Sequence, residues 1–510
     1  MSLAQVQGVV LSGVSGEMIR VEVDVADGLP SVGVVGLPDT SVSESRWRAR
    51  CAIGSIGGTW PNRRVTISLS PAEVRKNGAG LDLPIAVGVL RASAQLADAD
   101  LGFTTFVGEL GLDGQIRPTH GALAGALAAR RAGIRRIIVP SASANEMRHL
   151  PGIDVIAADH LGQVVEILSG RFEGQPLPQP PQLAGVLPSP GPDLRDVRGH
   201  AHGRLALEVA AAGGHHLALV GAPGVGKTLL AERLPGVLPD LDDEDALEVA
   251  AVQSVAGSPR ADWEHCRPPM RAPHHSASAA ALLGSVHGRR VSPGAVTLAH
   301  RGVLFLDEAP EFARPALEGL RQPLESGVIS LNRSGWTGQL PAAFQLVLAA
   351  NPCPCGLRVG TGAGCSCAPA AVRRYATRLS GPLMDRIDIR LAIMRPSDAE
   401  IAANDPGESS RTVRERVVLA RERSAQRFVG LPWQVNARIP MGELRRSWRP
   451  DAGGADLLTD LDRRAPNLRG PDRILRMAWS IADLAGRDRP GRDEIGVAMA
   501  LRGATTGWSS

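Results

Sequence analysis

The feature that most restricts the fold is an apolar segment, HLALVG at 216–221, that runs directly into a glycine-rich loop and then into helix-forming residues. The loop fits the pattern G-x-x-x-x-G-K-[ST] in the strand, loop and helix context that this pattern requires, and it comprises Gly221, Ala222, Pro223, Gly224, Val225, Gly226, Lys227 and Thr228. Its glycines let backbone N–H groups converge on phosphate oxygens at a helix N-terminus. We therefore predict an α/β core with a nucleotide site, in which Lys227 reaches the β- and γ-phosphates and Thr228 binds Mg²⁺.

Lysine is so rare in this chain that the lysine of the loop is informative. Lys76 and Lys227 are the only lysines among 56 lysines and arginines. An ammonium is a compact point charge that the planar guanidinium of arginine cannot replace sterically. Since the chain otherwise uses arginine for its cations, we expect a specific role at each of these two positions.

Polar side chains follow two further apolar segments. Asp307 and Glu308 come directly after 302–306, and Asn351 comes shortly after 344–349. The carboxyl ends of parallel strands meet at one edge of a sheet, where α/β proteins bind ligands. We predict that Asp307 completes the Mg²⁺ site and that Glu308 is the base that polarises the attacking water, with Asn351 orienting that water. The alternative for the acidic pair is an ordinary capped strand end.

A length of 510 residues corresponds to about three domains. We predict an α/β domain at 1–170, a proline-rich linker at 171–192, a domain with the nucleotide site at 193–395 and a mostly helical domain at 396–510. The predicted strands of the first domain are 20–25, 31–35, 64–69 and 137–139, and its predicted helices are 82–96 and 121–132; in the last domain we predict helices at 412–427 and 472–484.

Charge and hydropathy narrow the partners and the compartment. The formal net charge is only +4, so nucleic-acid binding requires a local groove or pore. Six arginines between 411 and 427 indicate either a polyanion contact or a solvated helix face. The chain lacks a signal-like N-terminus and a run of the roughly 18 to 20 apolar residues that a membrane span needs. We expect a cytoplasmic protein with no membrane partner.

Four of the six cysteines form a tight group, Cys353, Cys355, Cys365 and Cys367. In a cytosolic chain such a group indicates a metal site or reduced thiols, not disulfides. Four thiolates are a common closed set for structural Zn²⁺, although the one-residue spacing is tighter than the usual C-x₂₋₄-C. Zinc and reduced cysteines both remain open.

Motifs along nearly the whole chain resemble those of the YifB/ComM family of magnesium-chelatase-like AAA+ ATPases. The matching segments are GLPD at 36–39, LSPAEVRKNG at 69–78, LDLP at 81–84, VGELGLDGQIRP at 107–118, RAPHHSAS at 271–278, LAHRGVLFLDEAPEF at 298–312, LRQPLESG at 320–327, NPCPCG at 351–356, RLSGPLMDRIDI at 378–389 and DRILRMAWSIADL at 472–484. The resemblance implies an α/β fold: a P-loop AAA+ ATPase core, an N-terminal Lon-protease-like (ribosomal protein S5 domain 2-like) α/β domain and a C-terminal helical lid.

The resemblance also implies catalytic roles and an assembly. Asn351 corresponds to sensor 1, Arg386 to the arginine finger and Arg469 to sensor 2, a position that Arg473 or Arg476 could also fill. The implied enzyme is an ATPase with ATP and Mg²⁺ as cofactors, working as a homo-hexameric ring with ATP bound between subunits. The alternative for Arg386 is an ion pair with one of two neighbouring acids, Asp385 or Asp388.

Two family insertions usually face the central pore, and here they correspond roughly to 273–297 and 328–339. The first carries Arg289 and Arg290, and the second carries Arg333 and Trp336. Arginines and an aromatic ring suit a phosphate backbone and base stacking, although ordinary polar hairpins are the alternative. ComM-type proteins resemble DNA helicases that promote branch migration in recombination and natural transformation, so we expect single-stranded or branched DNA as the partner. The alternative function is a protein-remodelling AAA+ module, such as a magnesium-chelatase-type ATPase subunit.

Similarity to Lon proteases does not imply peptide hydrolysis. Such enzymes need a serine nucleophile activated by a lysine. Alignment of KNGAG at 76–80 with the protease segment retains Lys76 but puts Gly80 at the position of the nucleophile. Proteolytic activity is therefore not expected.

Overall fold

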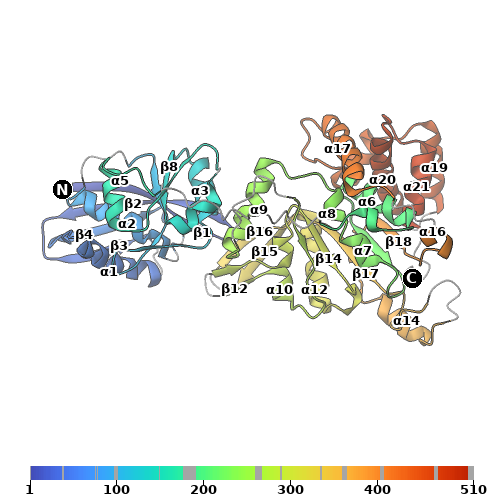
Figure 1. The fold of residues 1–510 in the computed structure, drawn as a ribbon, viewed down its shortest axis with the longest axis horizontal. Coiled ribbons are helices and arrows are strands. Elements are labelled where there is room, and N and C mark those ends of the chain that lie inside the picture. Colours follow the sequence, from blue (N-terminus) through green and yellow to red (C-terminus); the bar gives the residue numbers. More distant parts are fainter. Residues whose placement is uncertain are drawn as a thin grey trace.

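The computed structural model of the chain describes residues 2–36, 40–74, 76, 79–96, 101–148, 150–175, 191–258, 267–287, 290–333, 336–358, 364–402, 407–464 and 469–503. Two α/β sheets lie next to each other, and a group of helices covers one side of the second sheet (Figure 1). Most of the predicted linker at 171–192 falls outside the described residues. Among the described helices, none is long and apolar enough to cross a membrane.

The N-terminal sheet is mixed and has the strand order β3-β4-β2-β1-β5-β8-β9. Alternation of apolar and polar residues in β2 buries Val21, Val23 and Val25 on one face, as expected for a strand with one covered side. The strands are β1 (Ser2–Ser12), β2 (Ser15–Ala26), β3 (Ser31–Val35), β4 (Arg64–Ser70), β5 (Thr104–Phe106), β8 (Arg136–Val139) and β9 (Asp154–Ala157), with a small hairpin of β6 (Glu109–Leu110) and β7 (Ile116–Arg117). The helices are α1 (Thr40–Ser55), α2 (Asp82–Ala92), α3 (Ala122–Arg131), α4 (Ser141–Ala144) and α5 (Leu161–Leu168).

All four strands predicted in this part are present, but one predicted helix is too long. The expected helix at 82–96 ends at Ala92, because the chain turns at Ser93 and Ala94 adopts a left-handed conformation with φ of 58°. Leu96 is still buried, so its apolar character reflects packing beyond the helix end. Periodicity alone could not separate these two causes.

The second sheet is fully parallel, with the order β11-β14-β17-β10-β18. Its strands are β10 (Leu217–Val220), β11 (Met270–Arg271), β14 (Val303–Leu306), β17 (Gln345–Ala350) and β18 (Ile389–Ala392). Every residue of β10, β14 and β17 is buried, which explains their continuous apolar sequences. The helices of this part are α6 (Ala201–Gly213), α7 (Lys227–Ala231), α8 (Leu234–Val237), α9 (Asp243–Val255), α10 (Ala279–Leu283), α11 (Ala295–Leu298), α12 (Arg314–Gly319), α13 (Arg321–Ser326), α14 (Pro369–Ala376) and α15 (Gly381–Met384).

Two short antiparallel hairpins project from this part on the side of the N-terminal sheet (Figure 1). One is formed by β12 (Ser285–His287) and β13 (Arg290–Ser292), the other by β15 (Val328–Arg333) and β16 (Trp336–Pro341). Strand β12 packs against β15, so the hairpins are neighbours.

The C-terminal part consists of helices in the described residues: α16 (Asp398–Ala402), α17 (Ser410–Arg427), α18 (Met441–Ser447), α19 (Ala452–Arg464), α20 (Arg469–Ala485) and α21 (Arg492–Arg502). The arginines of α17 bind other groups of the chain, so a solvated helix face does not describe them as a set. Each has a partner within the chain: Arg411 pairs with Glu415, Arg414 with Asp240, Arg416 with Glu208 and Glu408, Arg421 with the carbonyl of Ala211, Arg423 with the carbonyl of Asp483, and Arg427 with the carboxylate of Asp483.

Helices α3 and α9 join the N-terminal sheet to the second part. Their apolar side chains share one buried core, and the N–H of Gly121 donates to the carbonyl of Ser254 over 3.2 Å. Glu146 is buried at this junction, beside Ser254 and the backbone of Leu123. Burial raises the pKa of Glu146 to about 7, because desolvation disfavours the charged carboxylate.

We predict that Glu146→Gln stabilises the chain at high pH. The ordinary glutamate pKa is 4.5, so the folded chain binds the extra proton between that value and about 7. The stability contributed by the buried acid is therefore present at low pH and lost as pH rises through about 7. At pH 8 the variant should gain about 3 kcal/mol of unfolding free energy, and the gain should shrink to less than about 1 kcal/mol at pH 5.

Denaturant unfolding at both pH values measures this effect. The matched control is Glu244→Gln, which removes an exposed carboxylate that pairs with Arg130 at the same junction. A surface ion pair contributes about 0 to 1 kcal/mol, so this control should change stability little and alike at both pH values. A gain for Glu146→Gln that does not depend on pH would contradict the assignment.

Candidate nucleotide-binding site

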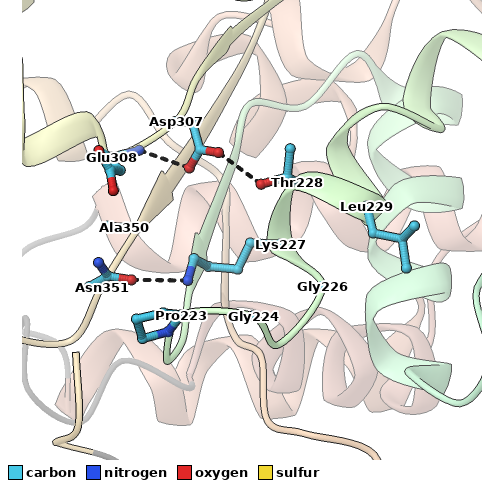
Figure 2. Close-up of a pocket in the computed structure, with 10 residues that line it drawn as sticks. All are labelled: Pro223, Gly224, Gly226, Lys227, Thr228, Leu229, Asp307, Glu308, Ala350 and Asn351. Carbon is cyan, nitrogen blue, oxygen red and sulfur yellow. Dashed lines mark hydrogen bonds between the residues drawn. The ribbon is translucent and has the colours of Figure 1, made fainter. Parts of the chain in front are cut away.

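A cavity of about 480 Å³ opens at the carboxyl edge of the parallel sheet. It is lined by Pro223, Gly224, Gly226, Lys227, Thr228, Leu229, Asp307, Glu308, Ala350 and Asn351. These residues come from the ends of three neighbouring strands and from the loop after β10 (Figure 2). The structure therefore brings together the predicted glycine-rich loop, the acidic pair and Asn351.

Strand register explains why these segments meet. Val220 of β10 is the partner of Ala350 of β17, and the N–H of Gly221 donates to the carbonyl of Ala350 over 3.1 Å. Leu306 of β14 is the partner of Leu348. The residues that follow each strand therefore leave the sheet at the same edge. Positive φ angles of 75° and 95° at Gly224 and Gly226 shape the loop, in a region that other residues adopt at a cost.

Lys227 is the first residue of α7, at the end of the glycine-rich loop, and is largely buried. Its Nζ donates to the carbonyl oxygens of Gly221 and Ala222 at 2.7 and 2.8 Å, and to Oδ1 of Asn351 at 3.1 Å. Figure 2 shows the lysine extending to the amide of Asn351. Burial lowers the pKa of Lys227, while the negative charges of Asp307 and Glu308 oppose that shift.

Thr228 and Asp307 place hard oxygen atoms side by side. Oγ1 of Thr228 donates to Oδ2 of Asp307 over 2.8 Å, and Oδ1 of Asp307 accepts from the N–H of Glu308 over 2.8 Å. A hydroxyl and a carboxylate are the ligand types that Mg²⁺ prefers beside substrate phosphates. This donor set fits a magnesium ion.

Glu308 follows Asp307 in a strained backbone conformation, with φ of 49°. Such outliers cost free energy and tend to occur at functional sites. Its Oε2 lies 3.2 Å from Nδ1 of His275, which follows β11 in the segment RAPHHSAS. The sequence did not reveal this contact, since His275 and Glu308 are more than 30 residues apart in the chain. The position of His275 just beyond the strand next to β14 was the available signal.

The predicted arginines lie outside the cavity lining. Arg386 pairs with Glu325 and donates to the carbonyl of Pro382. An ion pair of Arg386 with Asp385 or Asp388 was the alternative interpretation. It is wrong in its partners, because both of these acids bind other arginines.

Arg469 lies at the start of α20 and pairs with Asp385 over 3.1 Å. The two substitutes considered for it are buried at the contact between the sheet and the helical part. Arg473 binds Asp388, and Arg476 donates to the carbonyl of Ile439. In this conformation neither substitute reaches the cavity.

For the residues predicted to contact DNA, the structure describes at most the position of the backbone. Arg290 is paired with His287 near the end of the first hairpin, and Arg333 with Trp336 at the end of the second. The side chains of these residues, and Arg289 as a whole, lie outside the described residues.

The four predicted thiols come together. The Sγ atoms of Cys353, Cys355, Cys365 and Cys367 all lie within 4.8 Å of one another.

The other lysine of the chain, Lys76, lies in the N-terminal part. It is buried, and it donates a hydrogen bond to the carbonyl oxygen of Pro71.

Three family models match successive parts of the chain. The model described as "Magnesium chelatase, subunit ChlI" matches residues 193–401, the one described as "Subunit ChlI of Mg-chelatase" matches 21–143, and the one described as "Magnesium chelatase, subunit ChlI C-terminal" matches 407–502. The first of these contains the whole cavity lining.

Similar proteins extend over the full length. An uncharacterised protein of Mycobacterium tuberculosis is 46% identical over 98% of this chain and 99% of its own length. The protein YifB of Escherichia coli is 41% identical over 98% and 97%, and the competence protein ComM of Haemophilus influenzae is 38% identical over 98% and 98%. The chain belongs to the YifB/ComM family. It is therefore a magnesium-chelatase-like AAA+ ATPase, and the family implies ATP and Mg²⁺ as cofactors.

Lon proteases match over a shorter region. The Lon protease of Mycolicibacterium smegmatis is 26% identical over 176 residues, which are 32% of this YifB/ComM chain and 22% of that protease. The match is partial, and the Lon-like domain with its boundaries at 1–170 stays a prediction.

We predict that His275 positions Glu308 for ATP hydrolysis. His275→Ala removes the imidazole that contacts Oε2 of Glu308, so kcat should fall about 3- to 10-fold, the effect of an exposed ion pair of about 1 kcal/mol. ATP affinity should change less than about twofold, because the loop and Lys227 are untouched.

Steady-state ATPase assays and nucleotide titration separate these effects. His275→Gln, which retains a donor, should recover part of kcat. The control is His274→Ala, because His274 bonds to Ser276 instead of Glu308. A His275→Ala chain that loses ATP affinity while keeping its full kcat would overturn this role.

Proposed function

We propose that this chain is an ATP-hydrolysing ring motor that acts on DNA and promotes branch migration in recombination or natural transformation. The observation that carries the proposal is the convergence of Lys227, Thr228, Asp307, Glu308 and Asn351 on one cavity at the sheet edge. That set supplies each group that phosphoryl transfer to water needs within a single chain, apart from a cation from a neighbouring subunit.

Each residue has a chemical role in this proposal. The loop amides and Lys227 hold the β- and γ-phosphates, and Thr228 and Asp307 hold Mg²⁺, which neutralises charge on the phosphates. Glu308 accepts a proton from the attacking water, and Asn351 orients that water and Lys227 together through its side-chain amide.

The position of one arginine supports the proposed ring. Arg386 lies outside the lining of the chain's own cavity, so we assign it as a finger for the nucleotide of an adjoining subunit. The family resemblance assigns Arg469, which pairs with Asp385, as sensor 2. An arginine finger contributes about 10³ to 10⁵ in turnover. Hydrolysis would then depend on assembly, for which we propose a homo-hexamer.

The proposal for DNA rests on the two neighbouring hairpins. Arg290, Arg333 and Trp336 are next to the turns of these hairpins, and one full-length relative is the competence protein ComM. Cationic and aromatic side chains on adjacent loops suit a phosphate backbone and stacked bases.

The division of the chain into domains is also part of the proposal. We place the boundaries at 1–170, 171–192, 193–395 and 396–510.

A second candidate function is remodelling of a protein by a chelatase-type ATPase subunit. The family models favour it, because all three are described as parts of magnesium chelatase. This candidate predicts ATP hydrolysis that does not respond to DNA.

DNA-dependent ATP hydrolysis distinguishes the two functions. We expect single-stranded and forked or four-way DNA to raise the ATPase rate about threefold or more, since a ligand that binds the hydrolysing conformation more tightly shifts the population toward it. Branch displacement should occur with ATP and fail in Lys227→Ala. The double variant Arg290→Ala and Arg333→Ala should no longer respond to DNA, and the slope of its DNA affinity against salt should fall by about one unit for each phosphate that the variant leaves without an arginine.

The matched control for the double variant is Arg411→Ala, which removes an exposed arginine that pairs within α17 and should respond to DNA like the wild type. Failure of every DNA to bind or to stimulate hydrolysis would refute the motor and favour the chelatase-type function.

A further inference from the structure

The first two of the four clustered cysteines follow Asn351, which lines the nucleotide cavity, in the chain. Cys353 follows Asn351 by two residues and is buried, while Cys355, Cys365 and Cys367 are half-buried. The N–H of Gly356 donates to the carbonyl of Cys353 over 3.0 Å, which closes a tight turn around the first pair. The second pair leads into α14.

The spacing of the sulfur atoms matches a tetrahedral metal site. The Sγ atom of Cys353 lies 3.3 Å from that of Cys355 and 3.6 Å from that of Cys365, and the Sγ atoms of Cys355 and Cys365 are 3.7 Å apart. A tetrahedron with the Zn–S distance of about 2.3 Å has edges of about 3.8 Å. A disulfide requires about 2.05 Å, so none of these measured pairs is bonded.

The donor set indicates which ion fits. Four thiolates in a closed tetrahedral arrangement are typical of structural zinc, because they leave no open coordination position. Binding would release the thiol protons, because the thiolate is the form that ligates the metal. The tight CPC and CSC pairs, unusual in sequence, are compatible with this geometry because the chain brings them together from two sides.

We propose that Cys353, Cys355, Cys365 and Cys367 bind one structural Zn²⁺ ion, and that this ion holds Asn351 and the glycine-rich loop in the arrangement needed for hydrolysis. The coupling rests on the proposed ATPase site, whereas the metal site itself does not.

Two contacts would transmit the restraint. Gly356, with φ of 76°, packs so closely on Pro223 that an added Cβ would lie 2.5 Å from Cδ of the proline. The turn formed by residues 353–356 therefore contacts the glycine-rich loop directly. On the other side, Tyr375 of α14 is buried and hydrogen-bonds to the backbone of Asn351. Asn351 in turn accepts the hydrogen bond from Lys227.

Removal of the ion should therefore affect hydrolysis more than nucleotide binding. Without it, the segment that carries Asn351 keeps its covalent link to β17 but loses the anchor two residues later. The positions of Lys227 and Thr228 on α7 and of Asp307 after β14 do not depend on the ion. The expected signature is a lower kcat with nearly constant ATP affinity.

The test starts with the metal content of the full-length wild type, purified without chelators and measured by mass spectrometry of the elements. We expect about one zinc per chain. Cys355→Ser and Cys367→Ser should each lose most of it, lower kcat about tenfold and change ATP affinity less than twofold. Cys367→His should retain zinc and most of the kcat, since imidazole is also a zinc ligand. The matched control is Cys51→Ser, an exposed cysteine on α1.

Chelation of the wild type followed by re-addition of zinc keeps the test valid where a variant fails to fold. Loss and recovery of turnover in step with zinc content supports the proposal. The metal site is refuted by any of three results: chains that hold no zinc after reconstitution, chains that hold iron in its place, or a disulfide between these cysteines. Bound zinc whose removal leaves kcat unchanged overturns the coupling. Because metal content is measured independently of activity, an inactive ATPase would refute the proposed function and leave the metal site standing.

Discussion

Parallel pairing of β10 with β17, and of β17 with β14, is the constraint on which the site depends. It brings three segments that are separated by about 40 to 80 residues to the same sheet edge, with Gly221, Asp307 and Asn351 following the strands. The bonds from Lys227 to Asn351 and from Thr228 to Asp307 then link the loop to both neighbours. A slip in strand register would separate these pairs, so the packing of the apolar strands determines the chemistry that the edge can perform.

The helical part is attached to the same sheet through buried charges. His215, which precedes β10, lies 2.9 Å from Asp388 and 2.8 Å from Ser480 of α20. Arg473 also binds Asp388. Although burial acts in the opposite direction, the hydrogen bond with His215 and the charge of Arg473 hold the pKa of Asp388 below its ordinary value. An ion pair of this kind is costly to break, because a buried charge would lose its partner. The helical part is therefore firmly attached to the sheet.

Local patterns predicted much of this structure. The loop at 221–228 could be identified because its glycines, lysine and threonine are contiguous, and Asp307 and Glu308 because an apolar strand precedes them. The partner of Arg386 could not be predicted, since Glu325 lies about 60 residues away and is reached only through tertiary packing. The same reason applies to the contact of His275 with Glu308 and to the bond from Arg416 to Glu208. The cysteine cluster was foreseen from spacing, but its link to the loop through Gly356 was not.

The central claim is that ATP is hydrolysed at a boundary between two subunits, and mixing two inactive variants tests it most directly. Arg386→Ala keeps its own Glu308 but offers no finger, and Glu308→Gln offers a finger but has no base. Each alone should bind ATP and be nearly inactive. In a one-to-one mixture roughly a quarter of the boundaries would combine an intact base with an intact finger, so turnover should return to about that share of the wild-type rate. A mixture that stays as inactive as its components while still assembling would contradict the account.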